Sequence, residues 1–218
     1  MNELFRLLRP ALLLGAAAIL GVAIAAGCNG GTTIASVTPQ TSPTVAPPRL
    51  PNLVGSLTVT SGSFANGGTI PNIEALQGCG GTDGPHGEST DLTWTAGPAG
   101  TKSYTVIEFD PDAPTRSGFY HWVVFNIPAS TTSLALNASG TAAMPAGSVE
   151  ATNDYGFTGY GGPCPPAGDP AHHYNFIVSA LNVATLAGVT AANSGAFVTF
   201  NMDADVIAQG TLIGLYHQ

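Results

Sequence analysis

Acidic and imidazole side chains stand next to three candidate strand ends in this chain. Asp110 and Asp112 lie in the segment Asp110-Pro-Asp-Ala-Pro, directly after a β-branched run. His121 opens the next such run, and a Gly/Pro-rich loop leads into His172. Proline cannot donate a ladder hydrogen bond, so the first strand must end beside the two acids. The pattern predicts that three strand ends present carboxylates and imidazoles to one cavity mouth.

A carboxylate beside an imidazole favours the protonated ring, which can hold an anion through a charge-assisted hydrogen bond. The whole chain has five Lys and Arg residues and a formal net charge of -8. We therefore expect imidazolium to replace Lys or Arg in an anion pocket, and the affinity to weaken as the pH rises through roughly 6–8. The same acids and imidazoles could also bind a metal or perform hydrolysis. The chain has no Gly-x-Ser-x-Gly, His-Glu-x-x-His or Walker motif.

Each of these residues also has a purely structural interpretation. Asp110 could cap its own turn, and His121 could be a hydrogen-bonded histidine at a strand end. His172 and His173 alternate across one strand, so only one of them is expected to face the pocket. Trp94 and Trp122 are expected in the core.

The elements that must position these groups are predicted to be β-strands. The composition combines 28 Gly, 17 Pro and only 8% charged residues, which favours short strands and long loops over amphipathic helices. Short strands separated by turn-rich loops are typical of a sandwich. Helical turns are expected only near 183–187 and 204–209. The expected strands cover residues 57–60, 103–109, 121–127, 174–181, 196–202 and 211–216.

The N-terminus has the pattern of an export signal. Arg6 and Arg9 precede an uncharged apolar run over 11–26, which is short for a membrane-spanning helix. Ala-Ala-Gly before Cys28 resembles the lipobox of bacterial lipoproteins, which predicts a signal peptide over 1–27 and a lipid on Cys28. An uncleaved anchor and plain secretion are the alternatives. Residues 28–52 are predicted to form a Ser/Thr/Pro/Gly-rich tether, and 53–218 the folded domain.

The charge of the chain limits its possible binding partners, and the cysteine count limits its possible disulfides. After removal of 1–27, three basic and twelve acidic side chains remain, so nucleic-acid binding is excluded. Such an acidic domain has no electrostatic attraction to an anionic bilayer, and membrane contact is expected through the lipid alone. The expected location is the extracytoplasmic face of the membrane. Cys79 and Cys164 are left as one pair, either a disulfide or two buried thiols.

Several motifs in order resemble the phosphatidylethanolamine-binding protein family, in its bacterial Raf-kinase-inhibitor-like branch. The resemblance runs from about residue 55 to the C-terminus. It implies a β-sandwich of two antiparallel sheets with short peripheral helices, and a small pocket for phosphate-like anions and phospholipid head groups. The motifs are Asp110-Pro-Asp-Ala-Pro, His121-Trp-Val-Val-Phe-Asn-Ile-Pro, Asn153-Asp-Tyr-Gly, Gly159-Tyr-Gly-Gly-Pro-Cys-Pro-Pro-Ala-Gly and His172-His-Tyr.

By motif position, the resemblance implies a set of ligand-binding residues with no metal, cofactor or catalytic group. It implies a binding protein for a small anion or phospholipid head group. A protein-interaction module, such as a protease inhibitor, is the alternative, and a hydrolase or metal-dependent enzyme is less favoured. The implied pocket residues are Asp110, Asp112, Pro114, His121, Gly162, His172 and Tyr174.

The chain departs from the family pattern in two places. A Ser-Pro-Pro segment of the family is replaced by Glu88-Ser-Thr-Asp in a longer loop, so we expect an altered pocket rim near 88–91. His173 stands where the family usually has Arg, which replaces a fixed cation by one that titrates.

Overall fold

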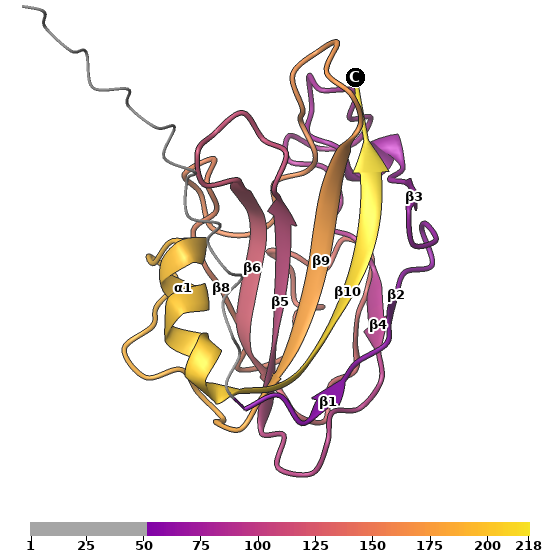
Figure 1. Ribbon diagram of the computed structural model, residues 1–218. Coiled ribbons are helices and arrows are strands. Elements are labelled where there is room, and N and C mark those ends of the chain that lie inside the picture. The colour runs from indigo at the N-terminus through magenta and orange to yellow at the C-terminus, as the bar shows by residue number, and fades with distance from the viewer. Residues whose placement is uncertain (1–51) are drawn as a thin grey trace, which may run out of the picture. The chain divides into compact units, whose positions relative to one another are not determined.

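The computed structural model describes residues 52–218, and the predicted signal peptide, Cys28 and nearly all of the tether lie outside this part. The described chain is mostly strands with one α-helix (Figure 1). No helix of this part is long and apolar enough to cross a membrane. The strands are β1 (Gly55–Ser56), β2 (Val59–Thr60), β3 (Gly68–Thr69), β4 (Leu92–Trp94), β5 (Ser103–Asp110), β6 (Phe119–Pro128), β7 (Ser133–Leu134), β8 (Val149–Glu150), β9 (His172–Leu181) and β10 (Val206–Tyr216); the helices are η1 (Asn72–Glu74), α1 (Gly195–Met202) and η2 (Asp203–Asp205).

Two sheets form the predicted β-sandwich. The larger has the order β1-β10-β9-β5-β6-β8, and β3 also pairs with β10; the smaller is β2-β4-β7. The smaller sheet is antiparallel as expected. The larger sheet is mixed, because β1 and β3 both run parallel to β10. Both are two-residue segments that join β10 at separate points, so one long strand receives two short parallel partners.

The larger sheet is covered on both faces. Along β5, Val106 belongs to a cluster with Leu92 of the smaller sheet, whereas Ile107 belongs to a second cluster with Val198 and Met202 of α1. This alternation follows from the two-residue period of a strand. The smaller sheet therefore covers one face and α1 the other, which fixes the central strands whose ends carry the candidate site.

The helix α1 corrects the sequence prediction, which placed a strand over 196–202. Ser194 caps the helix, since its hydroxyl accepts a hydrogen bond from the Phe197 amide at 3.3 Å. Val198 and Met202 lie one turn apart on the buried face, so packing overrides the strand preference of aromatic and β-branched residues. The helical turn expected near 183–187 is wrong, and the one expected near 204–209 is confirmed only in part, since η2 ends at Asp205 and β10 begins at Val206.

Both tryptophans are buried, as expected. Trp122 donates its indole N–H to Glu150 Oε1 at 2.7 Å, and Trp94 packs edge-on against Tyr104. A feature that sequence reasoning missed is Glu108 on β5, which is fully buried. Its carboxyl oxygens have no hydrogen-bond partner within the described chain, and burial, together with Glu74 and Asp110, raises its pKa well above the usual range.

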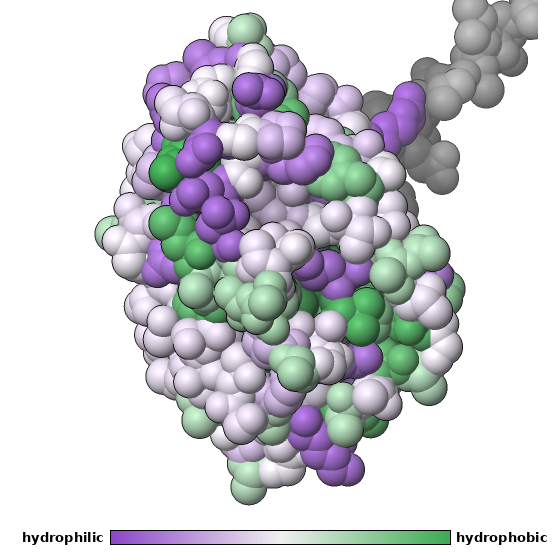
Figure 2. Space-filling model, turned by 180° about the vertical axis from the view of Figure 1, so that it is seen from behind, coloured by the Kyte–Doolittle hydropathy of each residue, from purple (hydrophilic) through white to green (hydrophobic). Residues whose placement is uncertain are grey.

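The surface reflects the scarcity of charge in the sequence. Figure 2 shows that much of the back of the molecule has intermediate hydropathy, with strongly hydrophilic residues forming a minor part. This agrees with charged residues being only 8% of the chain. A protein with so few basic groups must recognise a ligand by local geometry rather than by a long-range positive field.

Candidate functional site

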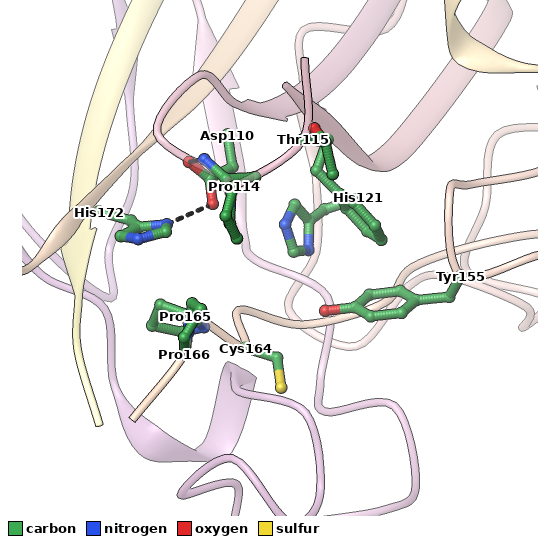
Figure 3. A pocket seen from close by; sticks show the side chains of 11 residues that line it. Asp110, Pro114, Thr115, His121, Tyr155, Cys164, Pro165, Pro166 and His172 are labelled. Carbon is green, nitrogen blue, oxygen red and sulfur yellow. Dashed lines mark hydrogen bonds and ion pairs between the residues drawn. The ribbon is translucent and has the colours of Figure 1, made fainter. Parts of the chain in front are cut away.

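A small cavity of about 180 Å³ lies where β5 ends and where β6 and β9 begin. Asp110, His121 and His172 meet there, so the structure brings together the acid and imidazole groups of the three strand ends (Figure 3). Its volume is below the range of pockets for drug-sized ligands, which restricts the site to a small ligand. The lining residues are Asp110, Ala113, Pro114, Thr115, Phe119, His121, Tyr155, Cys164, Pro165, Pro166 and His172.

Asp110 and His172 form a buried pair at the back of the cavity. Asp110 Oδ2 lies 2.7 Å from His172 Nδ1, and Asp110 Oδ1 accepts the backbone N–H groups of Asp112 and Ala113 at 2.8 and 3.1 Å. Asp110 therefore caps its own turn and also orients the imidazole of His172. Because a carboxylate only accepts, His172 Nδ1 carries a hydrogen, and Nε2, 3.7 Å from Asp169 Oδ2, is the free ring nitrogen.

His121 has a different electrostatic role from the one expected. Its Nδ1 lies 2.8 Å from the Gly161 carbonyl oxygen, so Nδ1 donates and Nε2 is an acceptor in the neutral ring. Burial lowers the pKa of His121 to about 4, although the Gly161 carbonyl and Asp110 oppose the shift. At neutral pH His121 is therefore uncharged, so of the two imidazoles that line the cavity only His172 is left to supply the positive charge expected from the sequence.

This shift predicts a loss of stability in acid that depends on His121. The unfolded state binds the proton at the ordinary pKa of 6.5, whereas the folded state does so only near 4. The stability that depends on the neutral ring is thus fully present above pH 6.5. The free energy of unfolding falls by about 3 kcal/mol as the pH drops to 4. Urea unfolding of wild type and His121→Asn across this range should give a stability difference that narrows in acid. Parallel pH profiles would refute the assignment.

An aromatic wall faces the Asp110–His172 pair. Phe119, His121 and Tyr155 have ring centroids 4.7 to 5.4 Å apart, and the Tyr155 hydroxyl donates to the Gly162 carbonyl at 3.0 Å. Sequence reasoning did not assign Tyr155 to the pocket. The sequence feature that could have indicated Tyr155 is the motif Asn153-Asp-Tyr-Gly. The Asn153 side chain donates a hydrogen bond to the Gly159 carbonyl and so shapes the loop that carries Tyr155.

Asp112 does not line the cavity. It turns outward and accepts from His173 Nδ1 and from the His173 amide, at 2.7 and 2.8 Å. His173 is exposed, as the alternation along β9 predicted. The two acids of the loop therefore pair with neighbouring histidines on opposite sides of β9, one pair buried and one exposed.

Tyr174 and Gly162 also lie outside the cavity lining, unlike Pro114, which forms part of it. Tyr174 is fully buried in the core beside His121, with ring centroids 5.1 Å apart. It is two residues, or about 7 Å, further along the strand than His172. A Cβ at Gly162 would collide with the Glu74 carbonyl oxygen, so Gly162 permits close packing behind the pocket.

One wall of the cavity is held by the predicted disulfide. Cys164 is bonded to Cys79, with Cα atoms 5.1 Å apart, and is followed in the wall by Pro165 and Pro166. The Leu76 amide also bonds the Pro163 carbonyl at 3.1 Å. The pocket loop is therefore attached to the loop before β4 by a covalent bond and by the backbone.

The altered segment 88–91 does not form the pocket rim. Thr90 is buried and donates to Glu74 Oε2 at 2.5 Å, while Asp91 accepts from Ser61 and Ser63. Ser89 lines a separate surface hollow that includes His86. The departure from the family pattern thus changes the neighbouring surface and leaves the cavity lining intact. Across 52–218, no three His, Cys, Asp or Glu side chains are grouped to hold a metal ion.

The chain has relatives among known proteins. A family model described as phosphatidylethanolamine-binding protein matches residues 60–217. The chain belongs to the phosphatidylethanolamine-binding protein family. The UPF0098 protein YbcL of Escherichia coli K12 is 42% identical over 161 residues, which cover 72% of this chain and 86% of YbcL. The crystal structure of E. coli YbcL matches with a TM-score of 0.68 and 38% identity, covering 75% of this chain and 99% of that one.

A relative with a lipoprotein name is also similar. The Mycobacterium tuberculosis H37Rv protein LppC, whose name gives it as a lipoprotein candidate, is 35% identical over 167 residues. The alignment covers 72% of this chain and 73% of LppC. The YbhB protein of E. coli K12, 40% identical over 157 residues, is covered over 97% of its length. Family membership establishes the ligand-binding fold of this chain.

Proposed function

We propose that this protein binds a small phosphate-bearing head group, such as phosphorylethanolamine, in the cavity between His172 and His121. The observation that carries the proposal is the buried Asp110–His172 pair at 2.7 Å. Asp110 fixes the imidazole so that Nε2 is the ring nitrogen left for a ligand. A protonated His172 would offer a charge-assisted hydrogen bond to a phosphate oxygen while Asp110 balances its charge.

The second imidazole favours a ligand that also carries a donor. Neutral His121 presents Nε2 as an acceptor, which suits an ammonium group or the hydroxyl of a singly protonated phosphate. The remaining walls, from Pro114, Phe119, Pro165 and Pro166, are apolar. A short ligand with an anionic and a donor end fits this set of groups better than a symmetrical dianion.

Export to the extracytoplasmic face and attachment through a lipid on Cys28 belong to the same proposal. The signal-like N-terminus supports it, as does the similarity to LppC. The disulfide between Cys79 and Cys164 is also typical of an oxidising compartment. Mass spectrometry of the N-terminal peptide from the purified protein would detect the lipid directly.

We further propose binding rather than catalysis. In the described lining, Cys164 is tied up in the disulfide, and the Thr115 hydroxyl donates to the Gly118 carbonyl at 2.5 Å. Neither is hydrogen-bonded to an imidazole as an activated nucleophile would be. Release of inorganic phosphate or ethanolamine from phosphorylethanolamine on incubation with the protein would overturn this part of the proposal.

Thermal unfolding tests the ligand. Phosphorylethanolamine at 100 times its Kd should stabilise the fold by about 2.7 kcal/mol, a rise in Tm of roughly 5–10 °C for a domain of this size. Inorganic phosphate and ethanolamine, measured alone, show which end of the ligand contributes. His172→Asn should abolish the shift. His173→Asn is the matched control, because that side chain lies next in the strand but is exposed, and it should keep the shift. Equal shifts in both variants would contradict the site.

A further inference from the structure

Four exposed apolar side chains lie where the chain enters the domain. Phe200 is 80% exposed and Phe197 43%, on one face of α1, while Leu53 and Val54 are 46% and 73% exposed. We call these four residues the entry patch. Exposed apolar side chains that lie together are more informative about an interaction surface than ones scattered singly.

Hydrogen bonds place the two halves of the entry patch side by side. The Asn52 side chain donates to the Ala204 carbonyl at 2.5 Å, in η2, directly after α1. The Val54 amide donates to the Ile207 carbonyl at 2.8 Å. Leu53 and Val54 therefore run beside the C-terminal end of the helix whose outer face carries the two phenylalanines.

The helix α1 has no charged residue. One face, with Val198 and Met202, is buried against the larger sheet, and the opposite face carries Phe197 and Phe200. A helix that is apolar on both faces is normally buried on both. No described residue covers the outer face, so a further surface is needed to bury it.

We propose that the entry patch lies against the phospholipid bilayer, an inference that rests on the proposed lipid at Cys28. Only 23 residues, 29–51, separate that cysteine from Asn52. The flexible tether that the sequence predicts here would span about 25–30 Å on average, so an acyl anchor would hold the patch within reach of the interface. Phenylalanine and leucine are the side chains that amphipathic surface helices bury at the boundary between head groups and acyl chains.

The charges around the patch define the kind of membrane surface. Asp203 and Asp205 follow α1 directly, and no Lys or Arg lies on α1 or η2. Burial raises the pKa of Asp203. This arrangement suits a zwitterionic interface and gives no attraction to an anionic one. The patch thus adds apolar contact to the acyl anchor, where the sequence had indicated contact through the lipid alone.

Tryptophan emission provides the test. Phe200→Trp places a reporter on the patch. Leu136→Trp is the matched control, because Leu136 is also exposed (42%) but lies far from the patch. It belongs to the loop after β7 in the smaller sheet, which covers the other face of the larger sheet. The native Trp94 and Trp122 are buried and provide a constant background. The lipidated full chain is purified from membranes and reconstituted in phosphatidylcholine vesicles, with or without acyl-brominated phosphatidylcholine. These vesicles contain no phosphatidylethanolamine, so they lack an ammonium head group with N–H donors for the pocket.

The proposal expects Phe200→Trp emission to shift to shorter wavelength on vesicles and to be mostly lost with brominated acyl chains, while Leu136→Trp emission is unchanged. Equal emission of Phe200→Trp in vesicles and in detergent-free solution overturns it. Emission that is already shifted in solution shows that a second copy or the tether covers the patch and also overturns it. An unmodified Cys28 in the N-terminal peptide overturns the attachment and the patch together, but leaves the head-group pocket, which is tested by ligand, untouched.

Discussion

Replacing Cys79 and Cys164 together by serine should lower the free energy of unfolding by about 4 kcal/mol. The disulfide closes a loop with a sequence separation of 85, and the chain entropy that such a loop removes from the unfolded state gives this magnitude. For a domain of this size, the loss corresponds to a fall in Tm of roughly 8–16 °C. Urea unfolding of the variant and wild type measures it.

A reductant distinguishes the bond from other effects of the substitution. Dithiothreitol should destabilise the wild type and leave the double serine variant unchanged. The free energy of ligand binding should fall less than the free energy of unfolding. The Leu76–Pro163 and Gly162–His86 backbone hydrogen bonds still hold the pocket loop when the disulfide is absent. If reduced and oxidised wild type unfolded at the same urea concentration, the disulfide would have no part in stability.

Asp110→Ala should cost about 3 kcal/mol of stability and remove head-group binding. The substitution leaves the buried His172 Nδ1 and the part-buried amides of Asp112 and Ala113 without their acceptor, and breaking a buried pair by removing one partner has a cost of this order. Urea unfolding measures the first effect, and loss of the phosphorylethanolamine-induced rise in Tm measures the second.

Asp112→Ala is the control that the chain itself offers. Asp112 lies in the same loop and bonds the next histidine at the same distance of 2.7 Å, but both side chains are largely exposed. Solvent-exposed pairs contribute less than about 1 kcal/mol, so this variant should stay close to wild type and keep its ligand. Similar losses of stability in Asp110→Ala and Asp112→Ala would show that burial does not make the Asp110–His172 pair more stabilising than the Asp112–His173 pair.

The sequence predicted the central strands well because they are β-branched and aromatic runs whose ends are marked by Pro, Asp or Gly. It failed at α1, where Ala-Phe-Val-Thr-Phe has the composition of a strand. The Ser194 cap and the burial of Val198 and Met202 decide the helix, and the second is a tertiary contact that no local pattern reveals. The parallel partners of β10 were also missed, because two-residue strands have no detectable period.

At the candidate site, the sequence predicted which strand ends carry the polar groups. It did not predict how deeply each side chain is buried. The two-residue period put Tyr174 on the His172 side of β9, yet position along the strand puts it in the core. The protonation of His121 could not be predicted either, because its cause is burial within the folded domain. Tyr155 lies in an irregular loop, where neither period nor propensity indicates direction.

The chain entry and the pocket lie at opposite ends of the larger sheet. His172 opens β9, and Leu181 at its other end pairs with Val206, next to where Val54 bonds β10 (Figure 1). Nine steps along a strand separate the two ends by about 30 Å. With the entry patch on the bilayer, a phospholipid could reach the cavity only after complete extraction, at about 0.8 kcal/mol for every acyl CH₂ exposed to water. Taken together, the two proposals therefore favour head groups that are already free in the aqueous compartment.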